Sequence, residues 1–465
     1  MLTYIKIDGF KSFQNFEMDF APLTVIAGPN AAGKSNLFDA LKLLSNLAST
    51  DKIQKAFHEQ RGDMLELFTQ YDDQSIAPEM SFVVEMLVNP TVTDTWGATE
   101  TLRYTRLRYE LKLRRFTNSI GLEDIEVVYE KLETVKHATD RWVRILPSQN
   151  AETWRPKVTT GRRQSPYINT EGKNGIATIV ISQDGKKGGN KRSFPLNHTT
   201  RTVLSSIDSV DFRHALAAKN EMMSWRFLQL NPEDLRIPTS KTGGEDIISP
   251  SGKNLGAVLY RIKLEDRFNL TEISRRLHSF LPNFVRVDVV DDEVNKQYVV
   301  VLQDVDGKTY TSRVLSEGTL RILTLCILCE DSKHRGLLCF EEPENGIHPF
   351  RIKAMAALLR DLSTDFSDPE IPLRQVIVNT HSNLFIKAIK TWLHEKCVTI
   401  NFAQVVNRVI TIGNERKIIL ASKITAVPKD CGQAEFCFAD NEQKISLNML
   451  EEYLATGDSE TTNTL

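Results

Sequence analysis

A glycine-rich segment near the start of the chain has the residue types and spacing needed to hold a phosphate. It reads Gly28-Pro29-Asn30-Ala31-Ala32-Gly33-Lys34-Ser35 and matches G-x-x-x-x-G-K-[ST] without a gap. Glycines let successive backbone N–H groups turn inward around a phosphate, the lysine reaches the β- and γ-phosphate oxygens, and the serine hydroxyl binds Mg²⁺. We therefore expect Ser35 to be a metal ligand, and we expect a nucleotide to contact Gly28, Pro29, Asn30, Ala31, Ala32, Gly33, Lys34, Ser35 and Asn36.

Two adjacent carboxylates end a second apolar segment. Residues 336–340 are apolar and directly precede Glu341 and Glu342. At the carboxyl end of a strand, the first acid can hold Mg²⁺, directly or through water, while the second can orient and deprotonate an attacking water. An exposed acidic turn is the other interpretation of such a pair. Behind a phosphate loop, we interpret Glu341 as a metal ligand and Glu342 as a catalytic base.

Two further polar sites could also contact a phosphate, but their sequence patterns are less specific. Ser316 and Gly318 precede an apolar helical segment, and a hydroxyl with a backbone N–H at a helix N-terminus forms an anion site. Ser316 on its own fits a simple helix cap equally well. His381 follows another apolar strand and can sense a γ-phosphate, although a single histidine is more often structural.

The spacing of apolar residues predicts the elements that position these motifs. Residues 23–27, 336–340 and 376–379 are expected to be short buried strands, and residues 35–45 and 320–330 have helical spacing. Each motif therefore lies where a strand ends or a helix begins, which predicts an α/β fold. Further strands are expected at 80–88, 102–113, 284–290 and 297–303, further helices at 210–225 and 255–281, and a polar tail at 456–465.

Composition excludes several classes of protein. The 465 residues are 41% apolar and 25% charged, as in soluble globular proteins. The formal charge of -2 excludes a polycation held to DNA by charge alone, so any nucleic-acid contact must use a local patch. Six cysteines are too few for a disulfide framework, and no apolar run approaches the roughly 20 residues that span a bilayer. We expect a cytoplasmic protein without a membrane segment.

The order of the four motifs resembles that of ABC-type ATPases. Residues 28–35, 315–319, 337–342 and 381 follow one another as Walker A, signature, Walker B and switch histidine do in that family. The opening Ile7-Asp8-Gly9-Phe10-Lys11-Ser12-Phe13 resembles the RecF/SMC branch. Residues 342–349 look like the D-loop of its short-armed, OLD-like relatives, which include ATPase subunits of bacterial anti-phage defence systems.

The resemblance implies an ABC-type head with two lobes, which binds ATP and Mg²⁺. It implies that Lys34, Glu342 and His381 are catalytic and that Glu341 and Ser35 hold the metal. It also implies a homodimer or higher oligomer, in which Ser316 and Gly318 of one head close over the nucleotide of the other. Glu341 replaces the family's usual aspartate, and the glutamine of the Q-loop has two candidates, Gln60 and Gln70.

The expected domains are a first ATPase lobe at 1–115, a basic β-rich insertion at 116–202, a helical segment with the second lobe at 203–410, and C-terminal strands, helix and tail at 411–465. Residues 151–202 contain ten Lys and Arg against three acids, including a Gly/Lys loop at 184–192. This basic stretch can bind phosphate backbones, face solvent, or dock an acidic protein.

The preferred function is a Mg²⁺-dependent ATP hydrolase whose ATP-driven head association controls a partner effector, a nuclease or a toxin, in anti-phage defence. One alternative is a DNA-repair or chromosome-maintenance ATPase that acts on DNA directly. Another is a scaffold that binds ATP without turnover and sequesters a partner.

Overall fold

The strand that precedes the phosphate loop lies inside a six-stranded sheet. The structure is a computed structural model, in which residues 1–73, 75–147, 149–158, 165–173, 176–184, 190–241, 246–368, 373–412, 415–429 and 441–462 are described. The strand order is β12 (Arg226–Leu228), β17 (Gly336–Glu341), β18 (Arg374–Thr380), β3 (Leu23–Ala27), β19 (Val398–Ile412) and β20 (Glu415–Ala426). All of these strands except β20 run parallel, so the loops after β3, β12, β17 and β18 meet at one edge.

Both faces of this sheet are covered, which explains why its strands are almost continuously apolar. On one face, Ile26, Leu337 and Ile377 share a core with helices α1 (Lys34–Ser49) and α4 (Arg213–Met223). On the other face, Val25 and Leu338 pack with α8 (Glu317–Glu330), α9 (Pro349–Leu362) and α10 (Asn383–Lys390). The sheet is therefore a rigid, buried platform for its edge loops.

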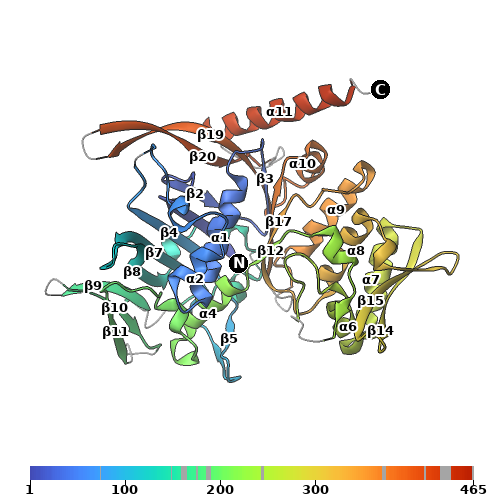
Figure 1. Ribbon diagram of the computed structural model, residues 1–465, viewed down its shortest axis with the longest axis horizontal. Coiled ribbons are helices and arrows are strands. Elements are labelled where there is room, and N and C mark those ends of the chain that lie inside the picture. The colour runs from blue at the N-terminus through green and yellow to red at the C-terminus, as the bar shows by residue number, and fades with distance from the viewer. Residues whose placement is uncertain are drawn as a thin grey trace.

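A second sheet, entirely antiparallel, shares the core of α1 and α4. The strands of this sheet form most of the left-hand side of Figure 1. The order is β11 (Lys191–Pro195), β10 (Ile176–Ser182), β9 (Ile168–Lys173), β8 (Glu123–Thr134), β7 (Arg106–Thr117), β4 (Glu79–Leu87), β1 (Leu2–Asp8) and β2 (Phe16–Asp19).

The α/β fold class is confirmed, and the basic stretch is joined to the first lobe rather than set apart from it. β7 runs across the expected boundary between residues 115 and 116, and β8 to β11 extend its sheet. Glu130 of β8, wholly buried, accepts hydrogen bonds from the backbone N–H groups of Val203 (2.6 Å) and Leu204 (2.8 Å). The division of the chain into four domains stays a proposal.

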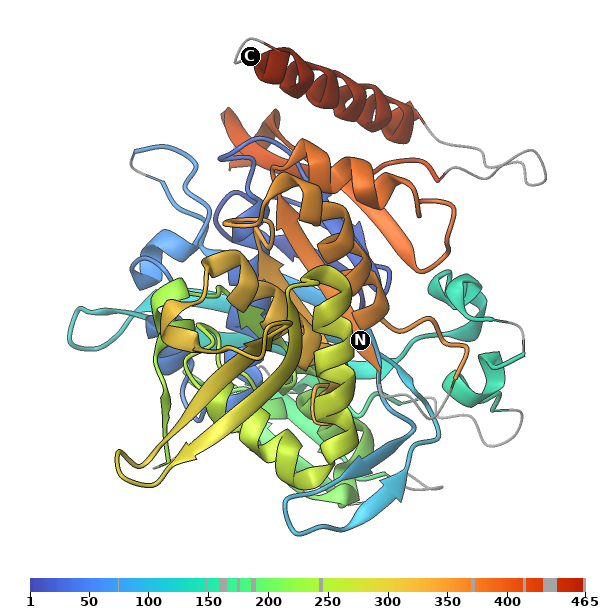
Figure 2. The same ribbon diagram turned by 90° about the vertical axis from the view of Figure 1, so that its right-hand side faces the viewer.

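The second lobe carries its own small sheet, seen in front in Figure 2. The expected helix at 255–281 is two helices, α6 (Leu255–Glu265) and α7 (Arg267–Phe280). The break occurs because Asp266 has an extended backbone and its carboxylate accepts the N–H of Phe268 (2.8 Å), which caps α7. These helices pack on β13 (Thr239–Ser240), β14 (Phe284–Asp292), β15 (Gln297–Asp304) and β16 (Thr309–Thr311).

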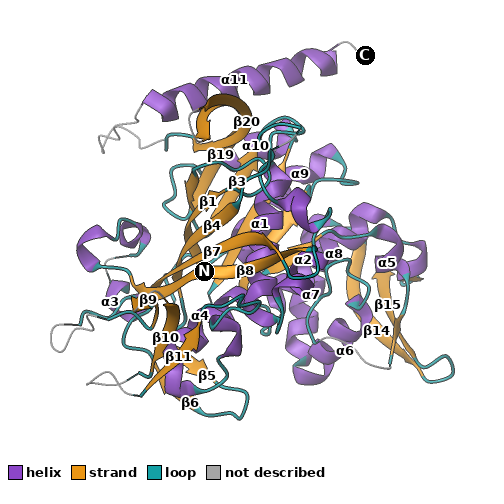
Figure 3. Cartoon of the chain, turned by 60° about the vertical axis from the view of Figure 1, so that its left-hand side comes forward, coloured by secondary structure: helices purple, strands orange, loops and turns teal. Residues whose placement is uncertain are grey.

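A long helix, α11 (Asn441–Thr462), lies across β19 and β20 at the top of the molecule (Figures 1 and 3). The expected polar tail at 456–465 is therefore wrong as far as Thr462, because the helix continues to that residue. Within the described ranges, no helix has the length and apolar character needed to cross a bilayer. The remaining elements are α2 (Ile53–His58), α3 (Ala151–Trp154), α5 (Pro232–Arg236), β5 (Thr91–Thr93), β6 (Thr99–Thr101), and the short 3₁₀ helices Met64–Leu67, His137–Thr139, Trp142–Ile145, Leu204–Ser206, Val210–Phe212 and Ser312–Val314.

Candidate active site

The phosphate loop joins β3 to α1 and is shaped by its two glycines. Gly33 has a left-handed backbone (φ 88°), and a Cβ there would lie 1.9 Å from the Ser422 hydroxyl. A Cβ on Gly28 would lie 2.4 Å from the carbonyl oxygen of Ala403 on the neighbouring strand. Any larger residue would collide at either position, so both glycines are required by the close approach of the β19–β20 pair.

Lys34 is buried inside this loop. Its ammonium donates to the carbonyl oxygens of Gly28 (2.7 Å) and Pro29 (2.8 Å). Burial lowers the pKa of Lys34, and the carboxylates of Glu342 and Glu344 act in the opposite direction. The side chain of Lys34 lies close to the N-terminus of α1, where an ammonium and the helix dipole would both attract a phosphate.

A cavity of about 660 Å³ opens beside the loop at the carboxyl edge of the six-stranded sheet. Ser35, Glu341 and Glu342, which the sequence analysis assigned to the metal and to the attacking water, line it together; their roles stay predictions. Arg321 of α8 also lines it, and its guanidinium donates to the Leu230 carbonyl oxygen (3.1 Å). The volume is within the range of small-molecule sites.

Glu342 is held from both sides. Its Oε1 lies 2.9 Å from Nδ1 of His381, and its Oε2 accepts from the Asn345 side-chain amide (2.8 Å). Glu342 also has a left-handed backbone (φ 44°), and its N–H donates to the Asn379 carbonyl oxygen (2.9 Å). A non-glycine residue in this conformation is strained, and such strain clusters at functional sites.

The residues at the cavity fit a divalent cation of the Mg²⁺ type. Among the described residues, Oε1 of Glu341 and Oδ1 of Asn379 are buried without a hydrogen-bond partner. The side chain of Asn379 also donates to the Ser35 hydroxyl (3.2 Å). Carboxylate, amide and hydroxyl oxygens are the ligands that Mg²⁺ prefers, and buried oxygens without partners are costly unless a ligand satisfies them.

Of the sequence-predicted residues, Ser35, Glu341 and Glu342 line the cavity, and Ser316, Gly318 and Asn36 make contacts elsewhere. Ser316 is exposed and caps α8, because its hydroxyl accepts the Thr319 N–H (3.3 Å). Gly318 packs so tightly against the D-loop that a Cβ would lie 2.8 Å from the Gly346 carbonyl oxygen. The Asn36 side chain donates to the Ser12 hydroxyl (2.8 Å), so it ties α1 to the opening motif.

Several polar residues at the cavity were missed in the sequence, among them Arg321, Asn345, Gln229 and Asn379. Gln229 follows β12 and lines the cavity, whereas Gln60 and Gln70 bond to nearby carbonyl oxygens of Ala56 and Asp72. The position of Gln229 depends on the pairing of β12 with β17, which the sequence does not show. Asn379 had a usable signal, because it ends an apolar strand at the same edge.

The buried carboxylate of Glu344 connects the D-loop (residues 342–349) to the loop that follows β18 and contains His381. Glu344 is 7% exposed, and its Oε1 accepts a short hydrogen bond from the Thr380 hydroxyl. Thr380 directly precedes His381, whose carbonyl oxygen accepts from the hydroxyl of Tyr453 on α11 (2.8 Å). Burial raises the pKa of Glu344. The Glu344–Thr380 contact therefore fixes the two loops that hold Glu342.

Replacing Glu344 with alanine is expected to lower the rate of ATP turnover about tenfold or more while ATP affinity stays within about twofold. The Thr380 hydroxyl would lose its acceptor, and His381 would no longer be held against Glu342. Glu344→Gln keeps a carbonyl oxygen for Thr380 and should retain most of the rate. Steady-state kinetics of the two variants test this, and equal loss in both would contradict the positioning role.

The basic stretch is only partly available to a ligand. Arg155 is buried and paired with Asp140 (3.0 Å), and Lys157 is paired with Glu152 (3.0 Å). Arg162, Arg163, Lys186 and Lys187 lie outside the described residues.

Comparisons with known proteins give a family for most of the chain. The profile of the family described as "AAA domain, putative AbiEii toxin, Type IV TA system" matches residues 23–387. No curated protein matches the sequence.

Solved structures with a similar fold include heads of Smc proteins. A crystal structure of an Smc head bound to the C-winged helix domain of ScpA shares 12% identity and a TM-score of 0.47, covering 90% of this chain and 98% of that one. An Smc head with an extended coiled coil, bound to the C-terminal domain of ScpA derived from Pyrococcus furiosus, shares 12% identity and a TM-score of 0.43, covering 97% and 98%.

Proposed function

We propose that this chain, which belongs to the AAA-domain family of the AbiEii type, is a Mg²⁺-dependent ATP hydrolase whose ATP-driven head association controls a partner effector. It carries the motifs of an ABC-type ATPase of the RecF/SMC/OLD-like branch. One observation supports the proposal most strongly. Ser35, Glu341 and Glu342 line a single cavity next to Lys34, although they come from distant parts of the chain.

The chemistry follows from the positions of these side chains. Lys34 and the N-terminus of α1 attract the phosphates of ATP. Mg²⁺, when bound by Ser35 and Glu341, supplies further positive charge against the phosphate oxygens. Glu342, oriented by His381 and Asn345, takes a proton from water as the water oxygen attacks the γ-phosphorus. The bond to the β-phosphate oxygen then breaks and leaves ADP and phosphate.

Closure of the site requires a second copy of the chain. Ser316 is exposed at the N-terminus of α8 and is not among the residues that line the cavity of its own chain. A γ-phosphate held by one loop alone leaves oxygens without donors, and a second helix N-terminus supplies a hydroxyl, an N–H and a favourable dipole. We therefore propose that ATP joins two heads with two-fold symmetry.

The proposed partner is an effector of an anti-phage or toxin–antitoxin system, either a nuclease or a toxin. The description of the family, which names a type IV toxin–antitoxin system, supports a protein partner. Direct action on DNA stays an alternative: Arg155 of the basic stretch is buried in an ion pair with Asp140, whereas Lys191 and Arg192 are exposed.

Phosphate release from ATP by the full chain tests the proposal. We expect turnover with Mg²⁺, loss of turnover with EDTA, and recovery when Mg²⁺ is added back. Tight ATP binding without phosphate release would instead indicate the scaffold. DNA binding with a steep salt dependence, together with stimulation of turnover by DNA, would indicate the DNA-repair alternative.

A further inference from the structure

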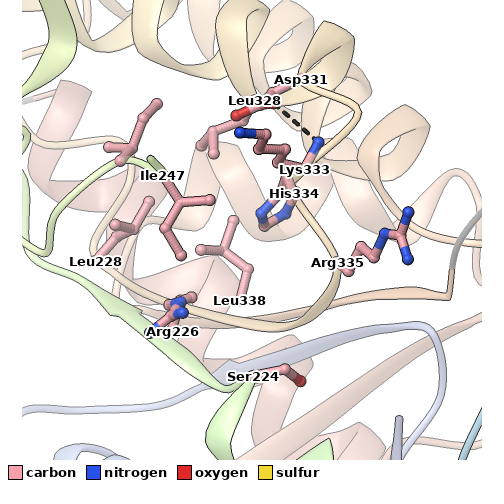
Figure 4. Close-up of a pocket in the computed structure, with 11 residues that line it drawn as sticks. Ser224, Arg226, Leu228, Ile247, Leu328, Asp331, Lys333, His334, Arg335 and Leu338 are labelled. Atoms are coloured by element: carbon pink, nitrogen blue, oxygen red, sulfur yellow. Dashed lines mark hydrogen bonds between the residues drawn. The ribbon is translucent and has the colours of Figure 1, made fainter. Parts of the chain in front are cut away.

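A second, smaller cavity lies at the opposite edge of the six-stranded sheet. It measures about 100 Å³ and is enclosed where β12 and β17 begin and α8 ends (Figure 4). Arg226 opens β12, His334 and Arg335 precede β17, and Asp331 follows α8. The other ends of the same two strands lead to Gln229 and Glu341, which line the first cavity. The two cavities therefore lie at opposite ends of β12 and β17 and have no lining residue in common.

His334 is the unusual residue of this cavity. Its side chain is 5% exposed, and Nε2 is buried without a hydrogen-bond partner among the described residues. In Figure 4 the imidazole lies among the lining side chains, with Leu338 between it and Arg226 in this view. A buried polar atom without a partner costs about 1–3 kcal/mol. A bound group that accepts a hydrogen bond from Nε2 would remove this cost.

The charges that act on the His334 imidazole are those of Arg374 and Arg226. Lys333 also lines the cavity but is paired with Asp246 (3.0 Å) and Glu265 (3.4 Å), and the Arg335 side chain points away from the others in Figure 4. Asp331, the carboxylate among the lining residues, is buried and paired with Arg261 (2.7 Å). The guanidinium of Arg374 is a cation close to His334, because it donates to the His334 carbonyl oxygen (3.0 Å). Burial, with Arg374 and Arg226, lowers the pKa of His334 to about 3. The imidazole is therefore neutral at pH 7 and can donate one hydrogen bond to an anion.

We propose that this cavity is a binding site for a free tetrahedral oxyanion of the phosphate or sulfate type. The guanidinium of Arg226 and the imidazole of His334 would bind its oxygens, and the nearby charge of Arg374 would attract it electrostatically. The aliphatic side chains of Leu228, Ile247, Leu328 and Leu338 limit the space. The volume corresponds to about three water molecules at ~30 Å³ each, which admits a small ion but not a nucleotide.

Equilibrium dialysis with radiolabelled inorganic phosphate tests the site in the absence of ATP. The full chain with Lys34→Ala is used, so that the phosphate loop is weakened. We expect it to bind about one phosphate per chain, and we expect Arg226→Met or His334→Leu in that background to weaken binding about tenfold or more. Arg267→Met, which removes an exposed cation on α7, should leave the affinity unchanged.

Two results would overturn the proposal. One is an absence of phosphate binding to the Lys34→Ala chain at millimolar concentration, which would mean that the cavity holds only water. The other is an Arg226→Met variant that is folded and binds phosphate with unchanged affinity. In the wild-type chain, phosphate should also raise the pKa of the His334 imidazole, measured from its ¹⁵N shift. Because no ATP is present, these results do not depend on whether the protein hydrolyses ATP.

Discussion

Lys34→Ala is expected to weaken ATP binding at least about 100-fold, equivalent to ~3 kcal/mol. The ammonium is the buried cation of the phosphate loop, and its bonds to the Gly28 and Pro29 carbonyl oxygens place it where the β- and γ-phosphates would lie. Its loss leaves the charge of these phosphates opposed only by loop N–H groups and the helix dipole. Isothermal titration calorimetry with ATP and Mg²⁺ measures the change.

The matched control is Lys42→Ala, which removes a lysine from the same helix away from the loop. The control should bind ATP like the wild-type chain. Unchanged ATP affinity in Lys34→Ala would contradict the assignment of the loop as the nucleotide site.

Glu342→Gln is expected to lower the rate of hydrolysis about 10²- to 10⁴-fold while ATP affinity is retained. An amide can still accept hydrogen bonds from its neighbours, but it cannot take the proton of the attacking water. Single-turnover measurement of phosphate release separates this chemical step from ATP binding.

Glu344→Gln is the matched control for this variant, because it neutralises a carboxylate two residues away that does not line the cavity. If Glu342→Gln hydrolyses ATP at the wild-type rate, another residue must be the base.

The elements predicted most accurately are those whose own residues show a clear pattern, without reference to a pairing partner. Leu23–Ala27 and Gly336–Glu341 were predicted because a strand covered on both faces is an unbroken apolar run. The start of α1 was predicted within a residue because the loop motif ends there. These elements place Lys34, Ser35, Glu341 and Glu342, so the phosphate loop and the acidic pair could be predicted, whereas most of the other residues that line the cavity could not.

The rest depends on pairing between distant segments. β12 has three residues and begins with Arg226, too short for any periodicity, and it exists as a strand because it pairs with β17. Gln229 was missed for this reason. The strands of the insertion (residues 116–202) belong to the sheet of the first lobe because β8 pairs with β7 along its whole length. Local composition does not specify this register.

The central claim is that ATP joins two heads, each of which supplies Ser316 to the nucleotide of the other. Ser316→Arg should still bind ATP but should neither dimerise nor hydrolyse, because the arginine blocks the proposed contact with the γ-phosphate. Ser316→Asp serves as its companion. Aspartate caps a helix as well as serine does, but it repels a phosphate, so this variant should also lose hydrolysis while α8 stays intact.

The most direct measurement is the ATPase activity of a mixture of Ser316→Arg and Lys34→Ala chains. Each variant alone should be inactive, because every site of its homodimer lacks either the signature serine or the loop lysine. A heterodimer contains one site with both residues intact, so the mixture should recover part of the wild-type activity. Normal hydrolysis by Ser316→Arg alone, or a mixture as inactive as its components, would contradict the composite site.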